Sequence, residues 1–270
     1  MKLLSYNRRL TLLCSAIAVT WIPVLLIAAE GRTPKSDAVN ANQETVEMFS
    51  AIENGQIAVK LIPKDSTQCR IFIENKTDKP LNVKLPETFA GVPVLAQRPG
   101  GGGGSTTRPG GSSSSGGNQS MGGGMGGGMM GGMGMFNVPP EKVGQLLVPT
   151  VCLEHGKGEP NARIPYEIKP LETVTTKPAV AELCRTLGTG QINQRAAQAA
   201  AWSLNNDMSW QELAAKRYRH ANGTMGQSYF SPLEIQTGMQ LAKMAVRTAE
   251  EKQQQKQQPG VTDETSPKVK

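Results

Sequence analysis

The spacing of apolar residues changes several times along this 270-residue chain. A mostly apolar run without charged residues comes first, from Leu10 to Ala29. Apolar and polar residues then alternate over residues 55–97, follow no period over 99–137, and alternate again over 143–174. From Pro178 onward apolar residues recur at the three- and four-residue intervals of a helix. The pattern therefore predicts a leader, a β-rich part and a helical part.

The apolar run is preceded by Lys2, Arg8 and Arg9, and a basic end followed by an apolar helix is the order of an export signal. The small residues that end the run favour cleavage after Ala29. The run is also about 20 residues long, enough to cross a bilayer, so an uncleaved anchor with its basic end in the cytoplasm is the alternative. Residues 1–29 thus predict export to the periplasm or the extracellular space, with any membrane contact made through this segment.

Five segments have the alternation or the short apolar runs of β-strands, separated by turn-forming residues. Together they predict an antiparallel β-sandwich of immunoglobulin-like type over residues 55–174. Three strands before the long patternless stretch, or two after it, would make a poor sandwich alone. The segments are IAVKLIP (57–63), CRIFIEN (69–75), LNVKLP (81–86), VGQLLVPTVCLEHG (143–156) and IPYEIKPLETV (164–174).

Residues 99–137 are dominated by Gly, Ser and Met. Such a segment cannot bury enough surface to offset the entropy of ordering it, so we expect a disordered insertion. Because strand-like alternation resumes directly afterwards, the insertion lies within one domain. A long loop costs little stability, since closure entropy grows only logarithmically with length.

Six methionines in this tract are candidate ligands for Cu(I), which soft thioethers select. No histidine or cysteine accompanies them, and glycine gives no preorganisation, so ordering the segment would consume much of the binding energy. We therefore favour the interpretation that the methionines are tolerated apolar residues in a repeat whose sequence drifts. A role as an adaptable apolar tether for partners ranks second. We expect no cofactor. The candidates are Met121, Met125, Met129, Met130, Met133 and Met135.

Residues 175–252 predict a helical domain of about four helices, and the polar residues 253–270 after it predict a disordered tail. Before the β-rich part, residues 30–54 predict a linker with a short helix. Capping boxes at Ser209–Glu212 and Ser231–Glu234 mark two helix starts. The expected core residues are Trp202, Trp210, Leu213, Tyr229, Phe230, Ile235, Leu241 and Met244.

Three cysteines follow the leader, and an oxidising compartment permits one disulfide among them. Three pairings are possible. We favour Cys152 with Cys184, because Cys184 lies in an amphipathic helix that could cover the strand bearing Cys152. Cys69 begins an apolar alternation and is expected to be a buried core thiol.

Cys152 and His155 are the only compact cysteine and histidine pair. They could form half of a zinc site or a thiol nucleophile with its base. Residues three apart on a strand point to opposite faces, so a structural cysteine and a surface histidine are favoured.

The formal charge is +7, of which Lys2, Arg8 and Arg9 supply three, and aromatic residues make up 4% of the chain. Neither a phosphate-tracking groove nor a base-stacking platform is indicated. We therefore expect no nucleic-acid partner.

The segments VPTVCLEHGKGEPNARIPYEI (148–168) and AAQAAAWSLNNDMSWQEL (196–213) resemble a recurrent layout of exported bacterial proteins without an assigned activity. In that group a β-unit ending in a Cys-Leu segment precedes a helical unit with a Gln-Ala-Ala and Trp signature. The resemblance covers about residues 55–250. It implies this architecture and export, and it transfers no catalytic residue.

Two classes of function remain. We prefer a non-catalytic binding or scaffold protein of the cell envelope, with a protein or other envelope component as partner. The alternative is a metal-handling protein using Met121–Met135 or a thiol enzyme using Cys152 and His155. The chain has only two histidines and no G-x-S-x-G or H-E-x-x-H motif, so we expect no enzymatic activity.

Overall fold

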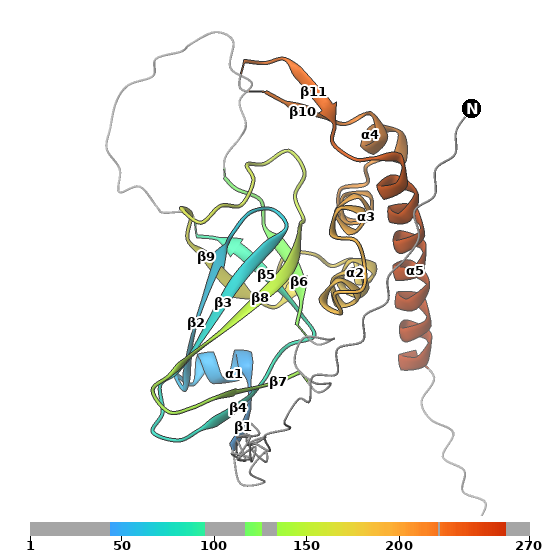
Figure 1. The fold of residues 1–270 in the computed structure, drawn as a ribbon. Helices are drawn as coiled ribbons and strands as arrows, with labels where there is room; N and C mark the ends of the chain where they lie inside the picture. The colour runs from blue at the N-terminus through green and yellow to red at the C-terminus, as the bar shows by residue number, and fades with distance from the viewer. Residues whose placement is uncertain (1–43, 95–116, 126–133, 221, 258–270) are drawn as a thin grey trace, which may run out of the picture. The chain divides into compact units, whose positions relative to one another are not determined.

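A computed structural model describes residues 44–94, 117–125, 134–220 and 222–257. They belong to one compact unit of the chain and confirm the α+β class, with mostly antiparallel sheets and five α-helices among the described residues (Figure 1). None of the described helices has the length and apolarity needed to span a bilayer. The predicted leader, residues 1–29, lies outside the described ranges.

Six antiparallel strands close into a barrel, so the predicted immunoglobulin-like sandwich is corrected. Closure is made at one point, where Leu61 pairs with Tyr166. This pairing joins the first and last strands of the sheet. The sheet is therefore closed and does not form the two facing layers of a sandwich. Around the barrel the strands are β2 (Ile57–Pro63), β3 (Gln68–Asn75), β8 (Val143–Cys152), β6 (Met121–Gly124), β5 (Thr88–Pro93) and β9 (Tyr166–Lys169).

A second sheet joins β1 (Glu44–Glu47), β4 (Leu81–Lys84) and β7 (Met135–Val138), with β1 parallel to β4. The helix expected within residues 30–54 is α1 (Met48–Glu53). Buried side chains of this sheet and of α1 belong to the same hydrophobic core as the barrel interior. The sheet therefore extends the barrel core instead of forming a separate layer.

The prediction of disorder over residues 99–137 is wrong at β6 and β7. All four residues of β6 are buried, and β6 pairs with β5 on one side and β8 on the other. Residues 99–116 and 126–133 of the tract lie outside the described ranges. The sequence of β6, MGGG, has no strand propensity, so only its tertiary surroundings can hold it in the barrel.

Helix α2 (Pro178–Gly188) lies directly on β6, and this contact explains the glycines. A Cβ atom on Gly122 would lie 2.9 Å from Sγ of Cys184, and one on Gly124 would overlap the carbonyl oxygen of Cys184. On the other face, a Cβ on Gly123 would lie 2.8 Å from the Phe89 ring inside the barrel. Helix and strand backbones therefore touch, and a strand with side chains would not fit.

The four helices predicted after residue 175 are confirmed. They are α2, α3 (Gln194–Asn206), α4 (Trp210–Ala215) and α5 (Pro232–Gln257). Both predicted capping boxes are present, since Ser209 exchanges hydrogen bonds with Glu212, and Ser231 does so with Glu234. Helix α5 continues beyond Lys252 to Gln257, which shortens the predicted disordered tail, and residues 258–270 lie outside the described ranges. A 3-10 turn, η1 (Leu171–Thr173), precedes α2, and a hairpin, β10 (Arg217–Arg219) and β11 (Met225–Ser228), joins α4 to α5.

Most of the predicted helical core is buried, including Trp202, Leu213, Phe230 and Leu241. Trp210, Tyr229 and Ile235 are partly buried. The prediction that Met244 is a core residue is wrong, because Met244 is 51% exposed. The buried stripe of α5 follows Gly238, Leu241, Ala242, Ala245 and Ala249, and Met244 lies beside this stripe, facing solvent.

Candidate functional site

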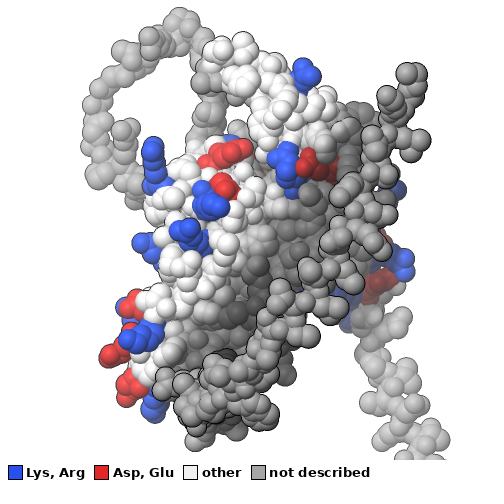
Figure 2. Space-filling model, in the orientation of Figure 1, with Lys and Arg blue, Asp and Glu red and all other residues white. Residues whose placement is uncertain are grey.

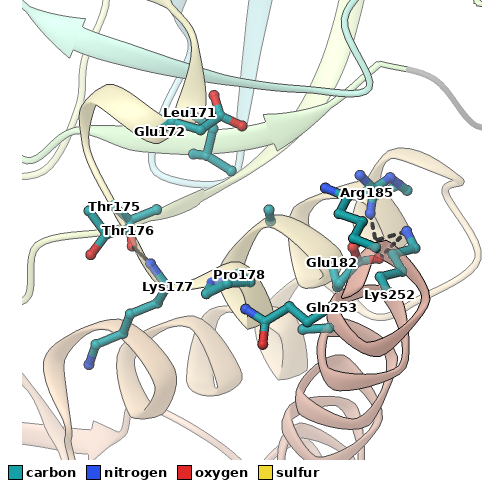
Figure 3. A pocket seen from close by; sticks show the side chains of 13 residues that line it. Leu171, Glu172, Thr175, Thr176, Lys177, Pro178, Glu182, Arg185, Lys252 and Gln253 are labelled. Carbon is teal, nitrogen blue, oxygen red and sulfur yellow. Dashed lines mark hydrogen bonds and ion pairs between the residues drawn. The ribbon is translucent and has the colours of Figure 1, made fainter. Parts of the chain in front are cut away.

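A pocket of about 330 Å³ lies between the start of α2 and the last turns of α5 (Figure 3). Its walls combine hydroxyls, long cationic side chains and two carboxylates. Helix α5 packs along α2, and residues of η1 and of the segment between η1 and α2 complete the lining. The polar lining residues are Glu172, Thr175, Thr176, Lys177, Glu182, Arg185, Lys252, Gln253 and Lys256.

Glu182 is a buried carboxylate in the wall of this pocket, only 8% exposed. Nζ of Lys252 lies 2.8 Å from its carboxylate, and the guanidinium of Arg185 forms a second ion pair with it. Burial acts to raise the pKa of Glu182, but hydrogen bonds from Arg185 and Lys252 outweigh this and lower it. The carboxylate is therefore charged at neutral pH and ties α5 to α2.

The cations of the pocket differ in how they are engaged. Arg185 also bonds Glu87 from the barrel side, with Nε to Oε2 at 2.7 Å, and Lys177 pairs with Asp207 at 2.7 Å. Lys256, by contrast, is an exposed lining residue that forms no ion pair among the described residues. On the face drawn in Figure 2, basic and acidic side chains are interspersed. The pocket thus combines the unpaired ammonium group of Lys256 with hydrogen-bonding groups. This combination suits a polar ligand with an acidic group.

Among the described residues Cys152 and His155 form no hydrogen bond with each other, and each has another partner. Cys152 ends β8 fully buried, with Sγ 3.9 Å from the carbonyl oxygen of Ser66. Burial is the main cause that raises the pKa of its thiol, with Glu159 and Asp65 adding to it. A thiol with a raised pKa is a poor nucleophile at neutral pH.

The favoured disulfide is also corrected, because Cys152 and Cys184 are both free, buried thiols. They belong to different cores: Cys184 faces Gly122 under α2, whereas Cys152 packs with Trp202 and Leu213. Cys69 is a buried core thiol of the barrel, as predicted. Burial raises the pKa of Cys69 and of Cys184 to about 12.

Three of the six candidate copper ligands are described by the structure. Met121 is fully buried inside the barrel, where Gly91 leaves room for it. Met125 and Met135 are partly buried near the ends of β6 and β7. The remaining three, Met129, Met130 and Met133, lie outside the described residues. Met121 already has a packing role and could bind a metal only if the barrel opened.

His155 contacts a lysine that the sequence analysis did not identify. Its Nε2 lies 2.9 Å from Nζ of Lys216, and the same ammonium lies 5.1 Å from the ring centroids of Trp202 and Tyr229. Burial, and then the charge of Lys216, lower the pKa of His155 despite the opposing charge of Glu212. Burial likewise lowers the pKa of Lys216. No local pattern predicts this cluster, because Lys216 reaches it only through the turn that ends α4.

No group of three or more potential metal-ligating His, Cys, Asp or Glu side chains occurs among the described residues. Comparison with protein-family models, with curated proteins and with solved structures returned no match for this chain. Function must therefore be inferred from the residues themselves.

Proposed function

We propose that this chain is an exported, non-catalytic protein of the cell envelope that binds an envelope partner, protein or otherwise, at the pocket between α2 and α5. The observation that carries the proposal is the lining of that pocket, which combines the exposed Lys256 with Gln253, threonine hydroxyls and the ion pair between Glu182 and Lys252. Groups of this kind bind acidic and hydrogen-bonding surfaces.

The side chains best suited to chemistry are committed to packing, which supports a binding role over catalysis. The thiol of Cys152 is buried, and Met121 fills the barrel. Helices α2 and α3 both contact β8, so the pocket rests on elements joined to the barrel. A rigid support of this type lowers the entropy cost of binding.

Site-specific photo-crosslinking in intact cells tests the proposal. A photoreactive residue at Gln253, on the pocket rim, should give a discrete adduct in the envelope fraction. The same residue at Lys60, an exposed position on β2, is the matched control and should give none. Lys256→Glu should weaken the adduct at position 253. Equal labelling at both positions, or none at 253, would contradict a binding role for the pocket.

Export is tested separately by the intact mass of the protein recovered from the envelope fraction. A mass beginning at Glu30 is expected if the leader is cleaved, and a full-length mass in the membrane fraction if it is retained as an anchor. Recovery of the protein in the cytoplasmic fraction alone would contradict export.

A further inference from the structure

Helix α5 carries a row of exposed polar residues spaced one heptad apart. Gln236, Lys243, Glu250 and Gln257 follow one another at intervals of seven residues, and all four are exposed. Seven residues make almost two turns of an α-helix, so these side chains lie along one side of it, about 10 Å apart. The row therefore has an amide at each end and two opposite charges in the middle.

The two charged members of the row have no partner of opposite sign within the described part of the chain. Neither Lys243 nor Glu250 forms an ion pair there, whereas Arg247 and Glu251 of the same helix pair at 2.7 Å. Because Lys243 and Glu250 are separated by about 10 Å along the helix axis, they do not neutralise each other by direct contact. Both charges are available to a second molecule.

A groove of about 410 Å³ lies at the centre of this row, between α5 and the helices α3 and α4. Lys243 and Glu250 line it together with apolar side chains. Val246, at its centre, is 37% exposed, so burial of this surface would favour association. The charges beside it would fix the orientation of a partner. The apolar lining residues are Leu204, Trp210, Met239, Ala242 and Val246.

The row is complementary to itself when it is read in the opposite direction. If two copies of α5 lie antiparallel about a twofold axis just after Val246, Lys243 of each copy lies opposite Glu250 of the other. Gln236 then lies opposite Gln257, and two amide groups can exchange hydrogen bonds. A parallel pair would instead place Lys243 beside Lys243 and Glu250 beside Glu250, which is unfavourable.

We propose that this groove is a homodimer interface, in which two copies of the chain pair their α5 helices antiparallel. Val246 and the apolar groove of each copy are buried against the other copy, and the two ion pairs between Lys243 and Glu250 set the register. The row lies roughly 100° or more around the helix from Lys252 and Lys256. The interface and the pocket between α2 and α5 therefore use different sides of α5, and the dimer does not depend on the function proposed for the pocket.

Charge reversal tests the ion pairs in the full chain by sedimentation equilibrium. The unsubstituted protein should dimerise with a dissociation constant of about 100 µM or lower. Lys243→Glu places like charges opposite each other twice and should raise this constant at least about tenfold, as should Glu250→Lys. The two substitutions combined restore opposite charges and should return the constant to within about threefold of the original. Lys60→Glu on β2 is the matched control for Lys243→Glu and should leave the constant unchanged.

Cysteine cross-linking tests the antiparallel geometry without relying on charge. Cys69, Cys152 and Cys184 are buried, so an exposed thiol on α5 should react faster with a short bismaleimide. Val246→Cys lies at the twofold axis and should give a cross-linked dimer. Gln236→Cys should give none, because the two copies of this position lie about 30 Å apart in an antiparallel pair.

Three results would overturn the proposal. The first is a protein that stays monomeric up to about 500 µM. The second is a dimer whose dissociation constant Lys243→Glu leaves unchanged, since the charge pairs would then not lie at the interface. The third is cross-linking through position 236 in place of position 246, which would indicate parallel helices.

Discussion

Two contacts of this protein rely on small residues, but they use them differently. Where α2 meets β6, glycines bring a helix backbone onto a strand backbone, and Gly188 of α2 continues the contact with Gly124. Where α3 meets α5, alanines keep their Cβ atoms and only Gly238 approaches the partner backbone.

The difference follows from what lies behind each contact. Strand β6 has α2 on one face and the Phe89 ring on the other, so neither face can accept a methyl group. Helix α5 has solvent on its outer face, as the exposure of Met244 shows, and can move outward by a fraction of an ångström. A confined element therefore needs glycine, whereas an element at the surface tolerates alanine.

The largest effect is expected for Gly124→Ala. Its Cβ would overlap the Cys184 carbonyl, and overpacking against backbone cannot be relieved by a rotamer change, so the free energy of unfolding should fall by about 3 kcal/mol or more. Urea unfolding measures the loss. Gly158→Ala is the control, since its Cβ meets only the Asn118 side chain at 3.4 Å and should cost less than about 1 kcal/mol. Equal losses would show that β6 is not confined.

The second-largest loss of unfolding free energy is expected for Gln198→Ala. This buried side chain accepts from the amide of Cys152 at 2.8 Å and donates to its carbonyl at 2.9 Å, joining α3 to the end of β8. Truncation leaves two buried backbone groups unpaired, and we expect about 2 to 4 kcal/mol of destabilisation. Gln191→Ala, at an exposed position before α3, should leave the unfolding midpoint nearly unchanged. A loss below about 1 kcal/mol at Gln198 would mean that its two hydrogen bonds do not stabilise the junction of α3 and β8.

Glu182→Gln tests the ion-pair link between α2 and α5 and should cost about 1 to 3 kcal/mol at pH 7. Because the folded-state pKa of Glu182 is lowered, its stabilisation is present above its unfolded pKa and is lost as the pH falls through the folded value. The difference between the two proteins in chemical unfolding should therefore shrink below about pH 4.3. A difference that stays constant down to pH 2 would argue against a charged Glu182.

The smallest effect is expected for Gly238→Ala in α5. Alanine gains about 1 kcal/mol of helix propensity, while its Cβ would lie 2.9 Å from the carbonyl of Ala196. The two effects nearly cancel, so we expect a net change within about 1 kcal/mol in thermal or urea unfolding. A loss as large as that of Gly124→Ala would remove the distinction between the two contacts.

Local signals in the sequence predicted the helical part well. The boxes at Ser209 and Ser231 fix helix starts through bonds within four residues. The strand at 57–63 has the predicted bounds, and the one predicted at 69–75 begins one residue earlier, at Gln68. Such features depend on neighbours in the chain, so a sequence pattern can contain them. The buried thiol of Cys69 follows from the same alternation.

The remaining features depend on distant residues. Strand β6 is ordered by α2 and Phe89, and barrel closure depends on the pairing of Leu61 with Tyr166. The pocket likewise requires Glu182 and Lys252, which lie 70 positions apart. No local period encodes these contacts, and a glycine tract gives the same sequence signal whether or not a helix rests on it.

Native-state hydrogen exchange of the amides of Gly122, Gly123, Gly124 and Met125 tests most directly whether β6 is an integral barrel strand. These amides should be protected to within a few-fold of those of the neighbouring β8, because β6 can leave the barrel only when α2 does. Exchange at the rate of an unfolded glycine peptide, while β8 stays protected, would show that the Met-Gly segment is a loop and that α2 rests on something else.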